Sequence, residues 1–248
     1  MKIIYILWLR QIKRYFRSRA RIIGSLGQPL LFLVDLGFGF GPIFVQAGGG
    51  NYFQFLAPGI IAMSILFTAL FSGIEIIWDK QFGFLKETLV APVSRFKIMI
   101  GRTLGGATVA TLQGIIVLLI SFIVGFRIGN VIMLPFGFIF MLLIALLFTA
   151  LGTAIASILE DMQGFQLIMN FIVMPLFFLS GALFPLQGLP KAIGIAASIN
   201  PLSYGVDGLR GTLVNGAQFG LGLDFIVLGF ITAILLSVGS YLFSKIQV

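Results

Sequence analysis

The sequence predicts an all-α membrane protein with six transmembrane helices, and three observations support this. The 248 residues are 59% hydrophobic and only 10% charged, with a mean hydropathy of +1.11, whereas soluble domains carry about 25% charged residues. Six apolar runs approach the roughly 20 residues that a spanning helix needs. Polar or glycine-rich stretches separate these runs. Helices are the expected fold, because backbone polar groups inside a bilayer must be satisfied within the segment.

Residues 1–21 are expected to form an amphipathic helix at the inner membrane surface. Cations fall on one side of the helix and aromatic and aliphatic residues on the other, at the i, i+3, i+4, i+7 spacing. The cations are Arg10, Lys13, Arg14, Arg17 and Arg21, and the opposite face carries Tyr5, Trp8, Leu9, Ile12, Tyr15 and Phe16. The helix either binds an anionic leaflet or serves only as a topology anchor. Both interpretations place this end inside.

The remaining chain divides into six spans and the polar segments between them. The spans are expected at residues 22–46, 53–77, 103–126, 131–157, 165–181 and 224–243. The first should be irregular, since it contains Pro29, Asp35 and the sequence GFGFGP. Short outer turns are expected at 48–51 and 127–130, and a tight inner turn at 160–163.

The region 182–222 is too rich in proline and glycine for one straight span and too apolar for an exposed loop. Short re-entrant helices on the outer side are therefore expected before the last span, because broken backbone at membrane depth must be shielded by protein.

The distribution of Lys and Arg predicts the topology. The inner segments hold 13 of the 16 cations: seven in 1–21, five in 78–102, and Lys245. The outer segments hold three, namely Arg127, Lys191 and Arg210. This asymmetry favours a multi-pass protein of the cell membrane with both termini cytoplasmic. The net charge of +8 lies near membrane edges, which argues against nucleic acid as a partner.

The polar stretch 78–102, WDKQFGFLKETLVAPVSRFKIMIGR, carries seven of the 24 charged residues. Phe82, Leu85 and Leu89 share one helical face, and Pro92 disfavours helical geometry at the residue before it. An apolar stripe edged by charges is typical of a small helix that docks in a partner's groove. A helix resting on the membrane surface would show the same pattern.

The residue inventory excludes most catalytic chemistry. The chain has no cysteine and no histidine, which removes disulfides, thiol chemistry and histidine–metal sites. The phosphate-binding pattern GxxxxGK[ST] is missing, so the chain is not expected to hydrolyse ATP alone. Glu160 and Asp161 are adjacent in a turn and do not form a catalytic pair. The chain is expected not to be an enzyme and to hold no metal.

Two carboxylates fall within the expected spans, Asp35 in the middle of the first and Glu75 near the inner end of the second. Intramembrane ionisable groups are candidate functional residues. A gating or lining role is favoured for both, although ion coupling through Asp35 stays open as an alternative. Glu75 is close enough to the interface to reach water or to pair with Lys80.

The sequence resembles the type-2 family of ABC exporter permeases. The stretch DKQFGFLKETLVAPVSRFKIMIGR is similar to the first cytoplasmic loop of that family. FLSGALFPLQGLP at 178–190 and NPLSYGVDGLRG at 200–211 resemble its second hallmark. The resemblance covers nearly the whole chain and identifies 1–248 as a single permease domain, with a connecting helix at 1–21, a coupling loop at 78–102 and an outer re-entrant region at 182–222.

The resemblance implies a dimer of permease subunits, with an interface in the first, second and fifth spans, and two separate ATP-binding subunits that hold ATP and Mg²⁺. A coupling helix at about Gln81 to Ala91 would contact the ATPase, with the connecting helix beside it. The implied coupling residues are Phe82, Gly83, Leu85, Glu87, Leu89 and Pro92. The implied connecting-helix cations are Arg10, Lys13, Arg14 and Arg17. The pathway or gating candidates are Asp35, Glu75, Asn200, Pro201, Tyr204 and Arg210.

The stretch LAPGIIAMSILFTALF at 56–71 is similar to the multidrug and antibiotic-resistance branch of the family. This implies export of a drug, an antibiotic or a lipid. A polysaccharide or lipid-linked glycan remains the alternative substrate, because aromatic faces can stack on sugars. A scaffold without transport activity is a third, weaker hypothesis.

Overall fold

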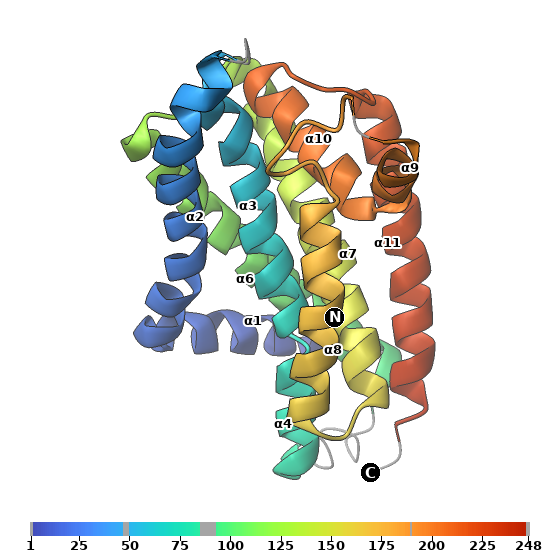
Figure 1. Cartoon of the computed structure of the whole chain (residues 1–248). Helices are drawn as coiled ribbons and strands as arrows, with labels where there is room; N and C mark the ends of the chain where they lie inside the picture. Colours follow the sequence, from blue (N-terminus) through green and yellow to red (C-terminus); the bar gives the residue numbers. More distant parts are fainter. Residues whose placement is uncertain (1, 47–49, 85–92, 189, 247–248) are drawn as a thin grey trace.

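The computed structural model describes residues 2–46, 50–84, 93–188 and 190–246. All regular secondary structure within these residues is helical (Figure 1). In chain order the helices are α1 (Lys2–Arg17), α2 (Arg19–Gln46), α3 (Tyr52–Phe71), α4 (Ile74–Gln81), α6 (Arg95–Val124), the 3₁₀ turn η1 (Val131–Met133), α7 (Leu134–Ile158), α8 (Met162–Phe178), α9 (Lys191–Ile199), α10 (Pro201–Val214) and α11 (Leu221–Ser244).

Five helical segments are long and apolar enough to cross a membrane, which confirms a multi-span membrane protein. They are Ile22–Gln46, Tyr52–Gln81, Arg95–Val124, Val131–Ile158 and Leu221–Ser244. The fifth expected span, 165–181, corresponds to α8, which is apolar but has only 17 residues. It is therefore shorter than the roughly 20 residues that cross a typical bilayer without local thinning.

The first span is one continuous helix, so the expected irregularity is wrong. Pro29 and Pro42 both lie inside α2. Proline is tolerated in membrane helices because neighbouring groups and small local adjustments satisfy the freed carbonyls. One of its glycines serves packing: a Cβ at Gly37 would lie 2.2 Å from the ring of Phe53, so a glycine there lets α2 approach α3, whereas a Cβ at Gly39 or Gly41 would have no neighbour within 4 Å.

Helix α3 is the centre of the bundle, and most of its side chains are buried against α2, α6, α7 and α10. Its inner end crosses α7 closely, because a Cβ on Gly73 would lie 2.5 Å from the carbonyl oxygen of Gly152. A Cβ on Gly152 would in turn lie 2.4 Å from the carbonyl oxygen of Leu70. Small residues that allow backbones to approach are typical of helix contacts in membranes.

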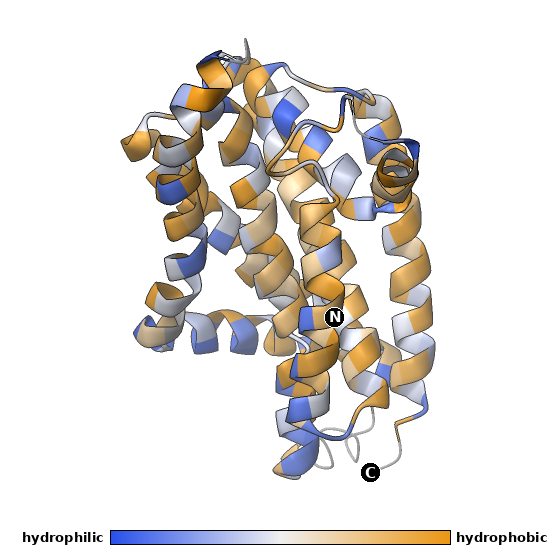
Figure 2. Cartoon of the chain, viewed as in Figure 1, coloured by the Kyte–Doolittle hydropathy of each residue, from blue (hydrophilic) through white to orange (hydrophobic). Residues whose placement is uncertain are grey.

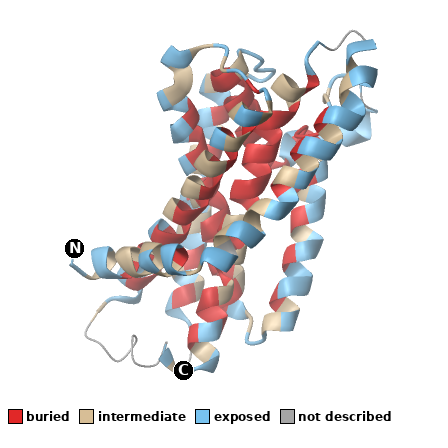
Figure 3. Cartoon of the chain, turned by 90° about the vertical axis from the view of Figure 1, so that its left-hand side faces the viewer, coloured by how far each residue is buried: buried red, intermediate tan, exposed pale blue. Residues whose placement is uncertain are grey.

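The long helices run side by side, and α1 lies across them near one end (Figures 1 and 3). The end of α4 and the start of α8 extend beyond α1, while the short helices α9 and α10 lie at the opposite end. Apolar residues dominate the long helices, and polar residues gather on α1 and the lower part of α4 (Figure 2). Two short helices, α9 and α10, thus precede the last span.

Candidate functional site

Helix α1 is fastened to the bundle through α6. The indole Nε1 of Trp8 donates to Thr108 Oγ1 at 3.0 Å. The buried hydroxyl of Tyr15 donates to Gln113 Oε1 at 2.6 Å. Part of the aromatic face expected at the membrane surface therefore contacts protein, whereas Tyr5 and Phe16 are exposed.

Two glycines of α6, one helical turn apart, allow α1 to lie this close. A Cβ on Gly101 would approach the Ile4 carbonyl oxygen to 3.1 Å, and a Cβ on Gly105 would lie 2.6 Å from the Gln11 side chain. Larger residues at either position would push α1 off the bundle.

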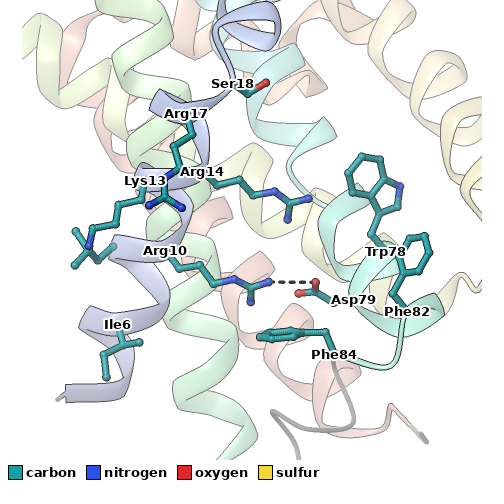
Figure 4. A pocket seen from close by; sticks show the side chains of 11 residues that line it. Ile6, Arg10, Lys13, Arg14, Arg17, Ser18, Trp78, Asp79, Phe82 and Phe84 are labelled. Atoms are coloured by element: carbon teal, nitrogen blue, oxygen red, sulfur yellow. Dashed lines mark hydrogen bonds and ion pairs between the residues drawn. The ribbon is translucent and has the colours of Figure 1, made fainter.

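An ion-pair network built on two buried carboxylates joins α1, α4 and α6, and Figure 4 shows its Arg10–Asp79 pair. Asp79 accepts from Arg102 Nη2 at 2.5 Å and from Arg10 Nη2 at 3.4 Å. Arg14 forms an ion pair with Glu75 at 3.6 Å. The two carboxylates are four residues apart on α4 and the two arginines four apart on α1, so each pair projects from one helical face. Buried charges are stable only when paired in this way.

The same arginines also contact aromatic rings. The guanidinium of Arg10 lies 4.0 Å from the ring centroid of Phe84, and that of Arg14 lies 5.4 Å from the ring centroid of Trp78. Both distances are within the range of cation–π attraction. The beginning of the polar loop is thus held to α1 by charge and by aromatic contact.

A cavity of about 930 Å³ lies between α1 and the start of the polar loop (Figure 4). Its charged lining residues are Arg10, Lys13, Arg14, Arg17 and Asp79, and its aromatic ones are Trp78, Phe82 and Phe84. Four of the five cations expected on the polar face of the helix at 1–21 therefore line one cavity. Four cations against one carboxylate make it positively charged.

The structure covers only the first part of the expected coupling helix. Gln81 is the last residue of α4, so it does not begin a new helix. Phe82 is 79% exposed, and Gly83 has a φ of +76°, a turn conformation that glycine adopts without strain. The remaining coupling candidates, Leu85, Glu87, Leu89 and Pro92, lie outside the described residues.

The two membrane carboxylates have different surroundings. Glu75 is buried and pairs with Arg14, not with Lys80 as suggested, because the Lys80 ammonium is turned toward the carboxyl end of α7. Asp35 lies on the exposed side of α2, in the middle of an apolar helix. The structure thus places Glu75 in the ion-pair network of α1, α4 and α6, whereas Asp35 lies outside it.

The other gating candidates lie at the opposite end of the bundle, around the start of α10. Asn200 accepts from Leu202 N at 2.9 Å and donates to the Leu176 carbonyl at 2.6 Å, so it caps α10 and ties it to α8. Pro201 occupies the first turn of α10, where its missing N–H is not needed. The hydroxyl of Tyr204 donates to the Ser198 carbonyl at 2.8 Å.

Arg210 joins α10 to α3 and to the segment after α8. Its Nη2 donates to the carbonyls of Phe55 at 3.2 Å and Gly181 at 3.0 Å, and its guanidinium lies 3.9 Å from the Phe55 ring centroid. Burial lowers the pKa of Arg210 to about 10, while Asp207 opposes that shift. The group therefore keeps its charge at neutral pH.

Four charged residues in these contacts between helices, Asp79, Arg102, Asp207 and Asp224, were not predicted as site residues from the sequence. Asp79 and Arg102 were noticed only as members of the polar stretch. Asp207 accepts from Gln218 N at 2.8 Å and from Phe219 N at 2.8 Å. Asp224 is fully buried, and neither of its carboxyl oxygens has a hydrogen-bond partner among the described residues. The only sequence signal for these residues is a charge close to the end of an apolar run.

The family match and the similar known proteins point to the same kind of protein. The family model described as ABC-2 type transporter matches residues 3–214. The chain is 30% identical over 206 residues to "Putative transport permease ycf38" of Cyanophora paradoxa, covering 80% of this chain and 71% of that protein. It is 32% identical over 213 residues to the same-named protein of Pyropia yezoensis, covering 81% and 70%.

A third relative is Nodulation protein J of Rhizobium leguminosarum bv. viciae. It is 28% identical over 197 residues, covering 79% of this chain and 75% of that protein. Together with the family match over most of the chain and the apolar helices, these similarities identify a membrane transport permease rather than a catalytic enzyme. The chain belongs to the ABC-2 type transporter family.

Proposed function

We propose that the chain is the transmembrane subunit of an ABC exporter, which moves a hydrophobic or amphipathic substrate outward while separate subunits bind Mg²⁺ and hydrolyse ATP. ABC-2 permeases normally work with an ATP-binding subunit. The observation that carries the proposal is the ion-pair network of Arg10, Asp79 and Arg102. It joins the polar loop to three helices at one end of the bundle.

The network gives a physical route for coupling. Closure of the ATPase subunits displaces the polar loop. Asp79 carries that displacement to α6 through its short, buried ion pair with Arg102, and Glu75 carries it to α1 through its 3.6 Å ion pair with the partly exposed Arg14. Helix α4 follows α3 after a turn at Ser72 and Gly73, so α3 moves too. The coupling requires that ATP binds one arrangement of these helices more tightly than the other.

The surface that binds the ATPase subunit is proposed to include the cavity beside α1 as well as the loop. Phe82 offers an exposed ring, and Lys13 and Arg17 have no carboxylate partner among the described residues. A partner surface with an apolar side chain and carboxylates fits this lining. Gly83, Leu85, Glu87, Leu89 and Pro92 remain proposed contacts on the same loop.

A second permease subunit is proposed to cover α2 and α8. Helix α8 exposes apolar side chains along one stripe: Leu167, Phe171, Met174 and Phe178. Such residues alone would suit lipid, but Asp35 on the exposed side of α2 would not, because a carboxylate at bilayer depth is costly. A subunit interface that borders the transport pathway shields this carboxylate. We propose that identical subunits pair here.

The end that carries α1 and the polar loop is proposed to face the cytoplasm, with both termini on that side of the cell membrane. The excess of Lys and Arg at this end supports the orientation. The joints around α10 would then close the outer side of the pathway.

Reconstitution tests the proposal directly. The permease is purified with the ATP-binding subunit encoded beside it, and efflux of amphipathic dyes and lipids is measured in vesicles. Transport should require both ATP and the ATPase subunit. Transport by the permease alone under a proton or sodium gradient, abolished by Asp35→Asn, would instead establish an ion-coupled carrier.

A glycan-bearing substrate is the second candidate, and one observation favours it. An outer pocket of about 600 Å³ combines amide side chains with aromatic rings, among them Asn51, Gln187, Gln218, Phe44 and Phe55. Amides and aromatic faces suit sugar hydroxyls and ring faces. Stimulation of ATP hydrolysis by glycolipids but not by uncharged drugs would favour this substrate class.

A further inference from the structure

The two ends of the polar loop each carry a cation bound to the carboxyl end of a different membrane helix. At the first end, Lys80 Nζ donates to the carbonyl oxygens of Ala156 at 3.0 Å, Ser157 at 2.9 Å and Leu159 at 3.0 Å. These carbonyls close α7. The ammonium group has three donors, and each has a carbonyl partner.

At the second end, Arg95 Nη1 donates to the carbonyl oxygens of Ser244 at 2.5 Å and Ile246 at 2.9 Å. These carbonyls close α11. Lys80 and Arg95 are 15 positions apart in the chain and flank the proposed coupling residues. The loop therefore contacts α7 through one end and α11 through the other.

The chemistry of helix ends explains both contacts. The last four carbonyls of a helix lack partners within the helix, and the macrodipole makes this end negative. A cation placed there forms charge-assisted hydrogen bonds, which are stronger than neutral ones. Here the cation comes from another segment, so the cap also ties that segment to the helix.

A neighbouring contact strengthens the first tie. Gln81 Nε2 donates to the carbonyl of Glu160 at 3.3 Å, in the turn between α7 and α8. Lys80 and Gln81 thus hold consecutive parts of the same helix end. Among the described residues, the ion pairs that join α1, α4 and α6 do not reach α7 or α11, so Lys80 and Arg95 supply charged contacts with these two helices that the ion pairs do not.

We propose that Lys80 and Arg95 are positioning residues for coupling: they clamp α7 and α11 to the polar loop, so that a displacement of the loop moves both helices with it. The clamp rests on the proposed function, because it transmits a displacement that an ATPase subunit would cause. It acts through the helices that it holds, and neither residue needs to contact substrate.

Transport stoichiometry tests the clamp. Lys80→Met and Arg95→Met remove the charge and keep an apolar stem, and the exposed Lys97→Met on α6 is the matched control. We expect the variants to purify with the ATPase subunit and hydrolyse ATP, while substrate moved per ATP falls about tenfold or more, as loss of hydrogen bonds to a charged group implies. Lys80→Arg should restore part of the ratio. An unchanged ratio in both Met variants would overturn the proposal.

A cross-link separates transmission from simple stabilisation. The chain has no cysteine, so Gln81→Cys and Glu160→Cys can be joined by a reducible bifunctional methanethiosulfonate. In the Lys80→Met background, the cross-link should restore the transport ratio, and reduction should abolish it again. If Lys80 only stabilised the fold, the cross-link would not restore the transport ratio. A ratio that stays low after cross-linking would therefore count against the clamp.

The permease alone provides a test that needs no ATPase. Spin labels at positions 81 and 160 should give a narrow distance distribution in the parent chain and with Lys97→Met, and a broad one with Lys80→Met. Lys80→Gln, which retains an amide donor, replaces the Met variant if that one does not fold. A narrow distribution in every variant would refute the clamp and leave the proposed function standing. Absence of ATP-driven transport by the parent complex would refute the proposed function and leave the clamp measurable.

Discussion

The buried pair of Asp79 and Arg102 gives the sharpest quantitative prediction. The Arg102 side chain is 4% exposed, and its Nε and Nη1 have no hydrogen-bond partner among the described residues. Asp79, at 2.5 Å from Nη2, therefore supplies its main compensation. Removing one partner of a buried pair costs about 3–5 kcal/mol, because it leaves the other charge buried and unpaired.

Coulomb's law gives a similar magnitude. Two unit charges about 4 Å apart attract by ~4 kcal/mol at an effective dielectric constant of about 20. Arg10 adds little, because its side chain is 36% exposed and such pairs contribute about 0–1 kcal/mol. We therefore expect Asp79→Asn to lower the free energy of unfolding by about 4 kcal/mol, nearly all of it through Arg102.

The assay is equilibrium unfolding in mixed micelles, with a double-mutant cycle as the control. Asp79→Leu combined with Arg102→Met should recover most of the loss, since an apolar pair leaves no unpaired charge. Arg10→Met alone should cost no more than about 1 kcal/mol. Equal costs for Arg10→Met and Asp79→Asn, or a double variant as unstable as the sum of the single ones, would refute the reasoning.

Four other substitutions test the contacts at the outer end of the bundle. Gly59→Val should cost at least about 1–3 kcal/mol in unfolding experiments, because its Cβ would lie 2.3 Å from the Ala182 carbonyl oxygen; a neutral effect would show that the two segments separate freely. Asn200→Ala should cost about 1 kcal/mol for the lost cap and speed hydrogen exchange at the start of α10; unchanged exchange would contradict the capping role. Asp207→Asn should cost about 1–3 kcal/mol, because an amide turned toward Gln218 N loses an acceptor. Asp224→Asn should be tolerated, because the buried Asp224 oxygens have no hydrogen-bond partner to lose among the described residues and an amide carries no charge to bury. The reverse order in thermal unfolding would disprove this assignment.

Sequence patterns predicted the spans well, because bilayer thickness imposes a length and an apolar composition that are visible in a linear chain. Prolines were a poorer guide: Pro29 and Pro42 suggested an irregular first span, yet α2 is continuous. Their effect depends on neighbouring helices and not on the segment itself.

The ion-pair network could not be predicted, although all of its members are conspicuous in the sequence. Arg10 and Arg14 match the pattern of a helix that faces lipid head groups, and nothing local indicates that their partners are Asp79 and Glu75. The pairing exists because Gly101 and Gly105 let α1 lie against α6, which places the Arg10 and Arg14 side chains within reach of the α4 carboxylates. Such contacts between distant segments follow from packing, which periodicity does not report.

The position of the charged joints relative to α3 indicates how the two ends of the bundle communicate. Near its outer end, α3 is held at Phe55 by the buried Arg210. At its inner end it continues into α4, where Glu75 meets Arg14. Phe55 and Glu75 are 20 positions apart, which corresponds to about 30 Å of helix, close to the thickness of the hydrocarbon core. Because α3 is buried along most of this length, a tilt imposed at α4 must change the packing around Arg210, whereas a local rearrangement of exposed helices such as α2 need not.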